Sequence, residues 1–508
     1  MQNANGSRGA GLGRRAVLFA FCVLQVALVG CAKAPPATTP ASPAPDPIAQ
    51  LQQSIISAIR MPGVSRAAWS VAVQSLDRRD GRLFTVNPGT LLVPASVAKL
   101  VSVATAADAV GWDYCYTTTM RAAGPIVNGV LQGDLIVVGS GDPSIGGRAG
   151  DDFTNWVQAL KTGGIRRIEG RVIGDDDLLD EPRPQLAWAW DDLGYTTGAL
   201  FGALNLAENR SAVTVSPGPS SGAPAVVTVD PRLAFRVVTN RVSTGPPGSL
   251  QLLWPEQRPG DPSLTIAGSI PAAAPAVSIP VAVGNPTLWF VSALKSRLVR
   301  EGIEVTGDAV DIDDVVPPPS RDTAAIIYSH RSRTLGEIAQ PLLKDSINLY
   351  AEALMRLNVA PGVFPTNDAA LEGMRKRLDA WGISNASYQL VDGSGLSRRD
   401  AISADAVLSV LERMADPSAK SPFVTGLPIA GVDGSLSTRM KGTPAENNVR
   451  AKTGTMSNIR TMAGYVTTRD RERLAFVIMI NNFEGTGANA NDAIDAIAVR
   501  LASFSRKP

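Results

Sequence analysis

The chain has very few of the side chains that build most metal and redox sites. It contains one histidine, His330, among 508 residues, which all but excludes a multi-histidine zinc or iron site. A Ser-His-Asp mechanism would depend on that single residue. Three cysteines cannot form a disulfide framework. The charges nearly balance, with 48 Lys and Arg against 46 Asp and Glu, so the composition gives no indication of nucleic-acid binding.

Long hydrophobic runs are also scarce, and the main one lies near the N-terminus. Residues 16–30 form a largely apolar run of 15, which suits the core of a signal peptide and is short for a transmembrane helix. The segment Leu28-Val29-Gly30-Cys31 resembles a bacterial lipobox, whose cysteine is acylated and becomes the mature N-terminus. An ordinary signal peptide is the alternative. We expect a signal peptide over 1–30, a proline-rich tether over 31–47, and a lipid-anchored protein on the periplasmic side of the cell envelope.

Two kinds of pattern divide the rest of the chain. Segments 48–119 and 315–508 combine helical spacing with strand alternation. Residues 120–314 consist mainly of short β-rich pieces between Gly and Pro turns. The clearest expected elements are strands at 82–86, 459–467 and 473–481 and helices at 48–59, 97–110, 334–344 and 490–504. We therefore expect an α+β core that is split by an inserted, mainly β region, with the N-terminal strands pairing with the C-terminal ones.

Three short motifs carry the functional signal, and the first is Ser96-x-x-Lys99. At the start of a predicted helix, residues i and i+3 share a face, so the lysine amine can reach the serine hydroxyl. A buried lysine can act as the base for a serine nucleophile without any histidine. Alone the motif is weak, because a core-facing serine and a solvent-facing lysine would give the same letters.

The second and third motifs lie far downstream. Ser346-Ile347-Asn348 falls between two helical patterns, where a helix N-cap is the default interpretation. Lys-Thr-Gly occurs twice. Lys161-Thr162-Gly163 ends a predicted helix, where glycine fits a left-handed cap. Lys452-Thr453-Gly454-Thr455 precedes β-rich segments, and a strand there would aim Lys452 at a pocket and offer a hydroxyl and a backbone N–H to a substrate. The second copy is favoured.

In this order, the three motifs resemble the active-site triplet of penicillin-binding proteins and serine β-lactamases. Ser346 comes 247 positions after Lys99. Such a long insertion resembles the class C, low-molecular-mass penicillin-binding proteins, the D-alanyl-D-alanine carboxypeptidase/endopeptidase group. Other segments that look like this group are Ser140–Pro143, Trp188–Asp192, Tyr350–Glu352, Asp392–Arg398 and Met462–Tyr465. The resemblance covers about residues 48–505.

The resemblance implies a β-lactamase/transpeptidase-like core, an antiparallel sheet flanked by helices, with mainly β domains inserted after the first motif. Ser96 would attack the carbonyl between two D-alanines of a peptidoglycan stem peptide, or a D-Ala–diaminopimelate cross-link, and Lys99 would accept its proton. Ser346 would relay a proton to the leaving amine, with Lys452 tuning it, and Asn348 would bind the substrate amide. The expected activity is a penicillin-sensitive serine D,D-peptidase that uses no metal or other cofactor.

The same resemblance implies a substrate pocket. The backbone N–H groups of Ser96 and Thr455 would form the oxyanion hole, and Thr453, next to Gly454, would contact the terminal carboxylate. Some relatives recognise a diaminopimelate side chain, and the positions that match theirs are Leu396, Arg398, Met456, Ser457 and Asp192. Asp191 competes with Asp192 for the last position. The alternative is that all of these are ordinary loop residues.

Two other functions stay open. A β-lactamase needs a water-activating residue, and no Glu-x-x-x-Asn segment lies between the first two motifs. A non-catalytic, peptidoglycan-binding lipoprotein on the same fold would show Lys99 turned away from Ser96.

Three further features are expected to carry no chemistry. Residues 218–222 fit G-x-S-x-G but lie in a proline turn, His330 is expected to be structural, and Asp311, Asp313 and Asp314 lack EF-hand spacing.

Overall fold

The computed structural model describes residues 46–79, 81–148, 152–230, 237–258, 263–418 and 420–507. The expected signal peptide, Cys31 and nearly all of the expected tether lie outside the described residues. Within the described ranges, none of the helices combines the length and the hydrophobicity that crossing a bilayer needs.

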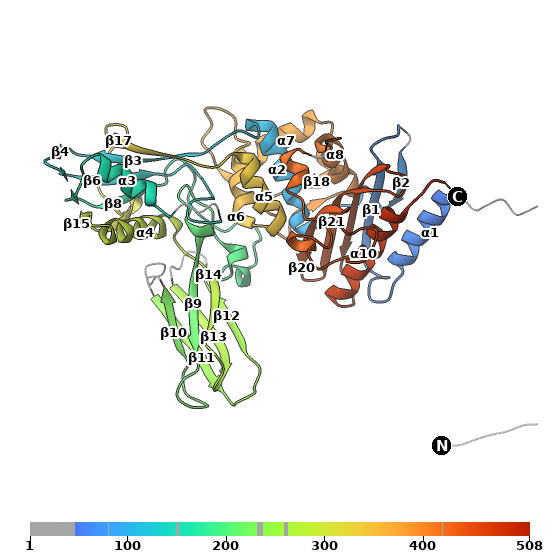
Figure 1. Cartoon of the computed structure of the whole chain (residues 1–508), viewed down its shortest axis with the longest axis horizontal. Coiled ribbons are helices and arrows are strands. Elements are labelled where there is room, and N and C mark those ends of the chain that lie inside the picture. Colours follow the sequence, from blue (N-terminus) through green and yellow to red (C-terminus); the bar gives the residue numbers. More distant parts are fainter. Residues whose placement is uncertain are drawn as a thin grey trace, which may run out of the picture. The chain divides into compact units, whose positions relative to one another are not determined.

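An antiparallel sheet of five strands joins the two ends of the chain (Figure 1). Its order is β2-β1-β22-β21-β20. The strands are β1 (Ala68–Ser75), β2 (Arg82–Val86), β20 (Arg450–Met456), β21 (Ile459–Thr467) and β22 (Arg473–Asn481). In the central pair, β1 and β22 run antiparallel from Ala68 opposite Asn481 to Ser75 opposite Leu474. The expected pairing of N-terminal with C-terminal strands is therefore confirmed.

Helices cover both faces of this sheet (Figure 1). Because side chains alternate along a strand, Phe476 and Ile478 of β22 pack with α1 (Pro47–Ile59) and α10 (Gly487–Ser503) on one face. The intervening Val477 faces the other layer. That layer consists of α2 (Ala98–Val110), α5 (Leu335–Asp345), α6 (Asn348–Arg356), α7 (Asn367–Ala380), α8 (Ala404–Met414) and α9 (Pro422–Thr425). Burial on both faces explains why β22 is almost continuously hydrophobic.

The helix ends follow from capping side chains. The Asp46 side chain accepts a hydrogen bond from the backbone N–H of Ile48, and Pro47 opens α1. The last helix begins at Gly487, earlier than the expected residue 490, because Thr486 and Asn489 cap each other reciprocally there.

A second five-stranded sheet, in the order β16-β8-β6-β3-β17, organises the middle of the chain. It contains β3 (Thr117–Ala123), β6 (Asp134–Val138), β8 (Val172–Asp175), β16 (Ala309–Asp311) and β17 (Ala325–Arg331). Helices α3 (Thr154–Thr162) and α4 (Pro286–Arg300) pack on one of its faces through Trp156 and Phe290. Strand β3 begins before the range 120–314 and β17 lies wholly after it. The limits of the inserted domain stay a prediction.

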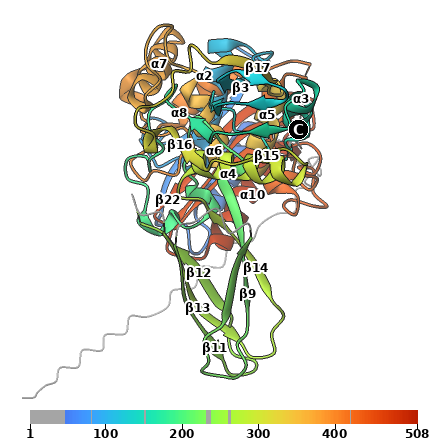
Figure 2. The same ribbon diagram turned by 90° about the vertical axis from the view of Figure 1, so that its left-hand side faces the viewer.

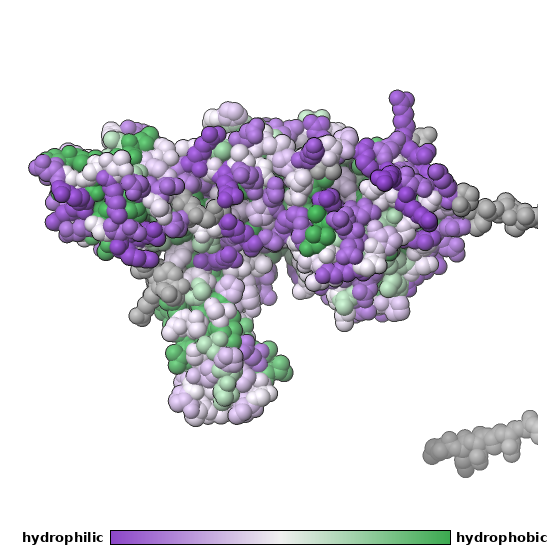
Figure 3. Space-filling view, in the orientation of Figure 1, coloured by the Kyte–Doolittle hydropathy of each residue, from purple (hydrophilic) through white to green (hydrophobic). Residues whose placement is uncertain are grey.

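Smaller sheets complete the middle region. One contains β4 (Ile126–Val127), β5 (Val130–Leu131), β7 (Arg167–Ile168) and β15 (Glu304–Val305). Two three-stranded sheets contain β9 (Arg210–Ser216), β10 (Val226–Asp230), β11 (Val237–Gly245), β12 (Leu252–Glu256), β13 (Ser263–Pro271) and β14 (Val277–Ala282), which run side by side in both ribbon views (Figures 1 and 2). Exposed apolar side chains such as Leu250 and Leu252 lie on this part, whose surface shows hydrophobic patches among paler ones (Figure 3). Residues 218–222 form the expected turn, between β9 and β10. A last pair, β18 (Tyr388–Gln389) and β19 (Ala401–Ile402), lies near the helical layer.

Candidate active site

The first motif lies where the chain turns into α2. Ser96 is in the middle of a single 3-10 turn, Ala95–Val97, and Lys99 follows in the first turn of α2. Ala95 has a φ of 46°, a left-handed conformation that is strained for a non-glycine residue. The turn is held by Thr461, whose hydroxyl donates a hydrogen bond of 2.7 Å to the carbonyl of Pro94. The half-buried Ser96 hydroxyl is thereby fixed at the edge of the sheet.

Lys99 is fully buried and its amine is held by three acceptors. Its Nζ lies 2.8 Å from Ser96 Oγ, 2.6 Å from Asn348 Oδ1 and 2.6 Å from the carbonyl oxygen of Ser394. Burial lowers the pKa of Lys99 to about 7, although nearby carboxylates act in the opposite direction. A substantial neutral fraction at neutral pH lets this amine take a proton from the serine hydroxyl.

The second motif spans the junction of α5 and α6. Ser346 adopts a left-handed conformation, with φ 62°, and caps the C-terminus of α5. The default interpretation of Ser346 as a helix N-cap is therefore wrong, since Ile347 occupies that position for α6. Asn348 opens α6, and while its Oδ1 accepts from Lys99, its Nδ2 donates to the carbonyl of Thr197 at 2.8 Å.

The third motif lies on β20, the edge strand of the first sheet. Lys452 is fully buried, and its Nζ is 2.9 Å from Ser346 Oγ and 2.6 Å from the carbonyl oxygen of Thr453. Burial, and then the charge of Lys99, lower the pKa of Lys452 well below its usual range. At Gly454 a Cβ would lie 2.8 Å from the Pro94 carbonyl oxygen, so only glycine lets β20 approach the Ser96 turn this closely.

The other Lys-Thr-Gly copy has no part in this arrangement. Lys161 lies in the last turn of α3 and pairs with Glu301 at 3.2 Å, and both side chains are well exposed. The left-handed residue after the helix is Gly164, with φ 74°, one position later than Gly163.

His330 stacks on Trp156, and its Nε2 lies 3.5 Å from Asp142 Oδ2, which fits the expected structural role.

The three motifs thus meet around two buried lysines, because Lys99 joins Ser96 to Asn348 and Lys452 bonds to Ser346. The sequence profile of the "D-Ala-D-Ala carboxypeptidase 3 (S13) family" matches residues 51–503. The chain belongs to this family. It is 32% identical to "D-alanyl-D-alanine carboxypeptidase" of Actinomadura sp. (strain R39), over 98% of this chain and 92% of that one. It is 26% identical to "D-alanyl-D-alanine carboxypeptidase DacB" of Haemophilus influenzae, over 78% of this chain and 82% of that one.

Among solved structures, penicillin binding protein 4 (dacB) from Haemophilus influenzae superposes with a TM-score of 0.75 at 24% identity, covering 89% of this chain and 98% of that one. A second structure of that protein, complexed with a β-lactam, gives a TM-score of 0.72 at 23% identity. These structures confirm the expected α+β penicillin-binding fold. The family match and the 32% identical relative confirm the serine-type D-Ala-D-Ala carboxypeptidase class.

Behind Lys99, this carboxypeptidase buries carboxyl groups whose contacts the sequence analysis did not predict. Glu352, one turn after Asn348, accepts hydrogen bonds from the backbone N–H groups of Gly393 and Ser394 at 2.9 to 3.1 Å. This fixes the carbonyl of Ser394 against the lysine amine. Burial, followed by the charge of Asp392, raises the pKa of Glu352 to about 7. In the sequence, Glu352 is visible only as part of a segment that resembles the family. Its spacing of four from Asn348, which places both on one helix face, is the signal that could have indicated its proximity to the site.

A loop from the inserted region closes this arrangement. Trp188 donates its indole N–H to Asp392 at 2.8 Å, and the hydroxyl of Ser397 donates to the carbonyl of Leu186 at 2.8 Å. Together with the contact between Asn348 and Thr197, these bonds fix residues 186–197 beside the catalytic motifs.

The positions expected to form the substrate pocket are only partly brought together. Burial raises the pKa of Asp192, Asp191 raises it further, and the positive charge of Arg398 lowers it, so Asp192 and Arg398 lie within electrostatic reach of each other. Leu396 and Arg398 follow the Ser394 carbonyl in the same loop. Met456 ends β20 and Ser457 begins the turn to β21. In the described part of the chain, no hydrogen bond joins Asp192 to these last two residues.

Proposed function

We propose that Ser96 is the nucleophile of this carboxypeptidase and Lys99 its general base. The observation that carries the proposal is the 2.8 Å contact between Lys99 Nζ and Ser96 Oγ, made by an amine whose pKa is about 7. A neutral lysine amine beside a serine hydroxyl supplies the pair that nucleophilic catalysis requires. The substrate is the bond between two D-alanines of a peptidoglycan stem peptide, or a D-Ala–diaminopimelate cross-link.

The reaction proceeds by acyl transfer in two steps. Lys99 takes the hydroxyl proton as Ser96 Oγ attacks the carbonyl carbon of the penultimate D-alanine. The C–N bond breaks, and Ser346, hydrogen-bonded to Lys452 Nζ at 2.9 Å, relays to the leaving amine the proton that Lys99 took from Ser96. Water then attacks the ester and restores the serine hydroxyl. Lys452 tunes Ser346 by contributing a buried amine whose protonated form is disfavoured.

The edge strand and the nucleophile turn bind the substrate. The backbone N–H groups of Ser96 and Thr455 stabilise the oxyanion, and Thr453, whose hydroxyl lies 2.6 Å from that of Ser435, contacts the terminal carboxylate. Asn348 binds the substrate amide. Gly454 belongs to the same wall because it permits the close approach of β20.

The side chain of the third stem-peptide residue lies in a pocket formed by Leu396, Arg398, Met456, Ser457 and Asp192. Diaminopimelate ends in an ammonium and a carboxylate, which pair with Asp192 and Arg398 respectively. The test compares D-alanine release from peptides with diaminopimelate or lysine-derived neutral side chains. Asp192→Asn lowers kcat/KM for the diaminopimelate peptide about tenfold and leaves the neutral peptide unchanged, whereas Asp191→Asn changes neither. An equal loss on both peptides contradicts this pocket.

β-Lactams are proposed as covalent inhibitors, because they acylate the same serine. The alternative functions predict different outcomes with nitrocefin. A D,D-peptidase is acylated and releases product slowly, a β-lactamase turns nitrocefin over continuously, and a non-catalytic binding protein does neither. The contact between Lys99 and Ser96 supports the enzyme.

Export and anchoring through Cys31 belong to the same proposal. Peptidoglycan lies outside the cytoplasmic membrane, so a peptidase acting on it must leave the cytoplasm. The test is mass spectrometry of the N-terminal peptide of the protein made in a bacterial host. An acylated Cys31 that disappears in Cys31→Ser supports anchoring, and an unmodified, cleaved N-terminus at another residue overturns it.

A further inference from the structure

Carboxyl groups gather where two parallel strands of the second sheet end. Strands β8 and β16 pair in parallel, with Asp311 opposite Gly174, so their carboxyl ends share one edge. Asp176 and Asp177 follow β8 directly. One carboxylate oxygen from each of Asp176, Asp177 and Glu181 lies within 4.8 Å of the other two. These three residues form the carboxylate cluster.

Asp176 is the buried member of the carboxylate cluster and is not fully satisfied by the protein. Its side chain is only 2% exposed, and its Oδ2 accepts a short hydrogen bond from the hydroxyl of Thr287. Its Oδ1 is buried and has no hydrogen-bond partner within the described residues. A buried carboxylate oxygen without a partner is costly, because the water it gives up on folding is not replaced. Asp177 and Glu181 are exposed, so the site is accessible from solvent.

The charges around the carboxylate cluster are negative. The carboxyl groups of Asp311, Glu181 and Asp313 lie close enough to Asp176 to repel its charge. Glu181 likewise lies within electrostatic reach of the negative charges of Asp313 and Asp311. The cluster thus collects like charges at one edge of the sheet.

Other carboxylates of the same segment have arginine partners. Asp175 pairs with Arg321 at 2.7 Å, and Asp180 pairs with Arg356. In the part of the chain that the structure describes, no Lys or Arg forms an ion pair with a member of the carboxylate cluster. The segment therefore contains carboxylates paired with arginine, Asp175 and Asp180, next to the three members of the carboxylate cluster, which have no such partner among the described residues.

We propose that Asp176, Asp177 and Glu181 bind a divalent cation with oxygen ligands, of which Ca²⁺ fits best. Carboxylate oxygens without nitrogen or sulfur ligands select hard cations, and Ca²⁺ tolerates irregular geometry and completes its coordination with water. The EF-hand spacing that Asp311 and Asp313 lack is not needed here, because the fold supplies the ligands from the end of β8 instead.

The site has a consequence for the rest of the molecule. The carboxylate cluster lies at the start of the segment that continues to Trp188, which bonds to Asp392, and to Thr197, which bonds to Asn348 of the second motif. A bound cation ties the beginning of this segment to the second sheet, and so helps to hold its far end in place. The cation is structural and takes no part in acyl transfer.

The test uses the full-length protein, stripped of metal with EDTA and freed of the chelator. Thermal unfolding and isothermal titration calorimetry are measured with CaCl₂, with MgCl₂ as the competing probe. We expect millimolar Ca²⁺ to raise Tm by about 2 °C or more and to bind with a stoichiometry of one. Both effects disappear in Asp176→Asn, which should also raise Tm without calcium because a like charge is removed.

Two further variants keep the test decisive. Glu181→Gln changes an exposed ligand, so it reports on the site even if Asp176→Asn fails to fold. Glu372→Gln removes an exposed carboxylate from α7 and serves as the matched control, which must keep the full calcium response. The proposal is overturned if the wild-type protein shows neither a Tm rise nor binding heat, or if Glu181→Gln responds like the control. Neither readout depends on the identity of the nucleophile.

Discussion

Acylation of Ser96 should follow the neutral fraction of Lys99, so its pH dependence tests the proposed base. Burial lowers the pKa of Lys99 from 10.5 to about 7. Since an amine loses its proton as pH rises, the reactive form is scarce below pH 7 and dominant above it. The neutral fraction is about 9% at one pH unit below the pKa and about 91% at one unit above it, a change of about tenfold.

The size of the shift explains why burial of this lysine matters. With an unshifted pKa of 10.5, only about 0.03% of the amine would be neutral at pH 7. The shift raises that fraction by about three orders of magnitude, equivalent to about 5 kcal/mol. Burial therefore supplies the base, and the three acceptors around Nζ hold it in place.

The assay is the second-order rate of acylation by benzylpenicillin between pH 5.5 and 9, followed by mass spectrometry after acid quenching. We expect a sigmoid with its midpoint near pH 7. Glu352 also titrates near pH 7, so Glu352→Gln separates the two groups. Because the Glu352 charge raises the pKa of Lys99, its removal should move the midpoint to lower pH. A flat wild-type profile, or loss of the pH dependence in Glu352→Gln, refutes the assignment of the profile to Lys99.

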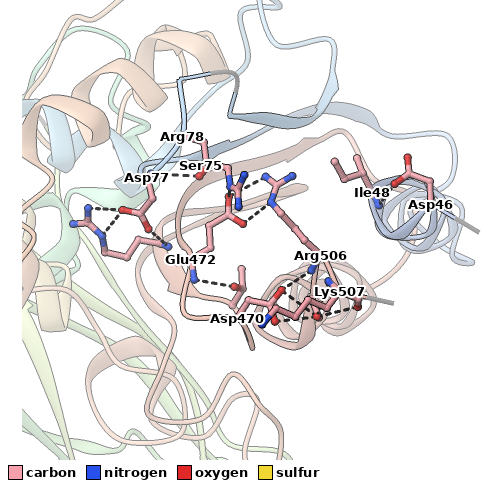
Figure 4. A network of polar contacts seen from close by, with 12 residues as sticks. Asp46, Ile48, Ser75, Asp77, Arg78, Asp470, Glu472, Arg506 and Lys507 are labelled. Carbon is pink, nitrogen blue, oxygen red and sulfur yellow. Dashed lines mark hydrogen bonds and ion pairs between the residues drawn. The ribbon is translucent and has the colours of Figure 1, made fainter.

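Three further substitutions probe the surroundings of the site and the C-terminal end of the chain. Asn348→Asp places a carboxylate at the position of the oxygen 2.6 Å from the catalytic amine, and should move the acylation midpoint above pH 7. Trp188→Phe removes the N–H donated to Asp392, and should cost about 1 kcal/mol in urea unfolding and slow acylation; wild-type values for both would contradict the role of the loop. Arg506→Ala removes both hydrogen bonds to Glu472 (Figure 4), and should cost about 1 kcal/mol at pH 7. This loss of unfolding free energy is present above pH 4.5 and disappears as pH falls through the lowered pKa of Glu472. Equal losses of unfolding free energy at pH 7 and pH 3 would contradict a stabilising role of the ion pair.

The strands that the sequence predicted are those with a clear hydrophobic pattern, alternating or continuous, that is bounded by turns. Strands β2, β21 and β22 match their expected ranges because hydrophobic residues fill their inward positions. Strand β3 was missed, since its inward positions include Thr118 and Ala122 and its hydrophobic pattern is weak. Strand β14 was missed because Pro280 interrupts its hydrophobic pattern. The sheet tolerates this proline because β14 is an edge strand.

In the candidate site, too, the sequence predicted some features and not others. The three motifs were visible because each is local, and their order identified the family resemblance. The contacts behind them were not visible, because they join residues far apart in the chain, such as Trp188 and Asp392, which are separated by 204 positions. The left-handed conformation of Ser346 was not visible either, because it ends α5, whereas the second motif alone would suggest an N-cap for the helix that follows.

Intact-protein mass spectrometry after benzylpenicillin tests the central claim most directly. The wild-type protein should gain the mass of one penicillin molecule, peptide mapping should place it on Ser96, and Ser96→Ala should stay unmodified. An adduct on another residue, or an unmodified wild-type protein with the drug left intact, would contradict the assignment of Ser96 as the nucleophile.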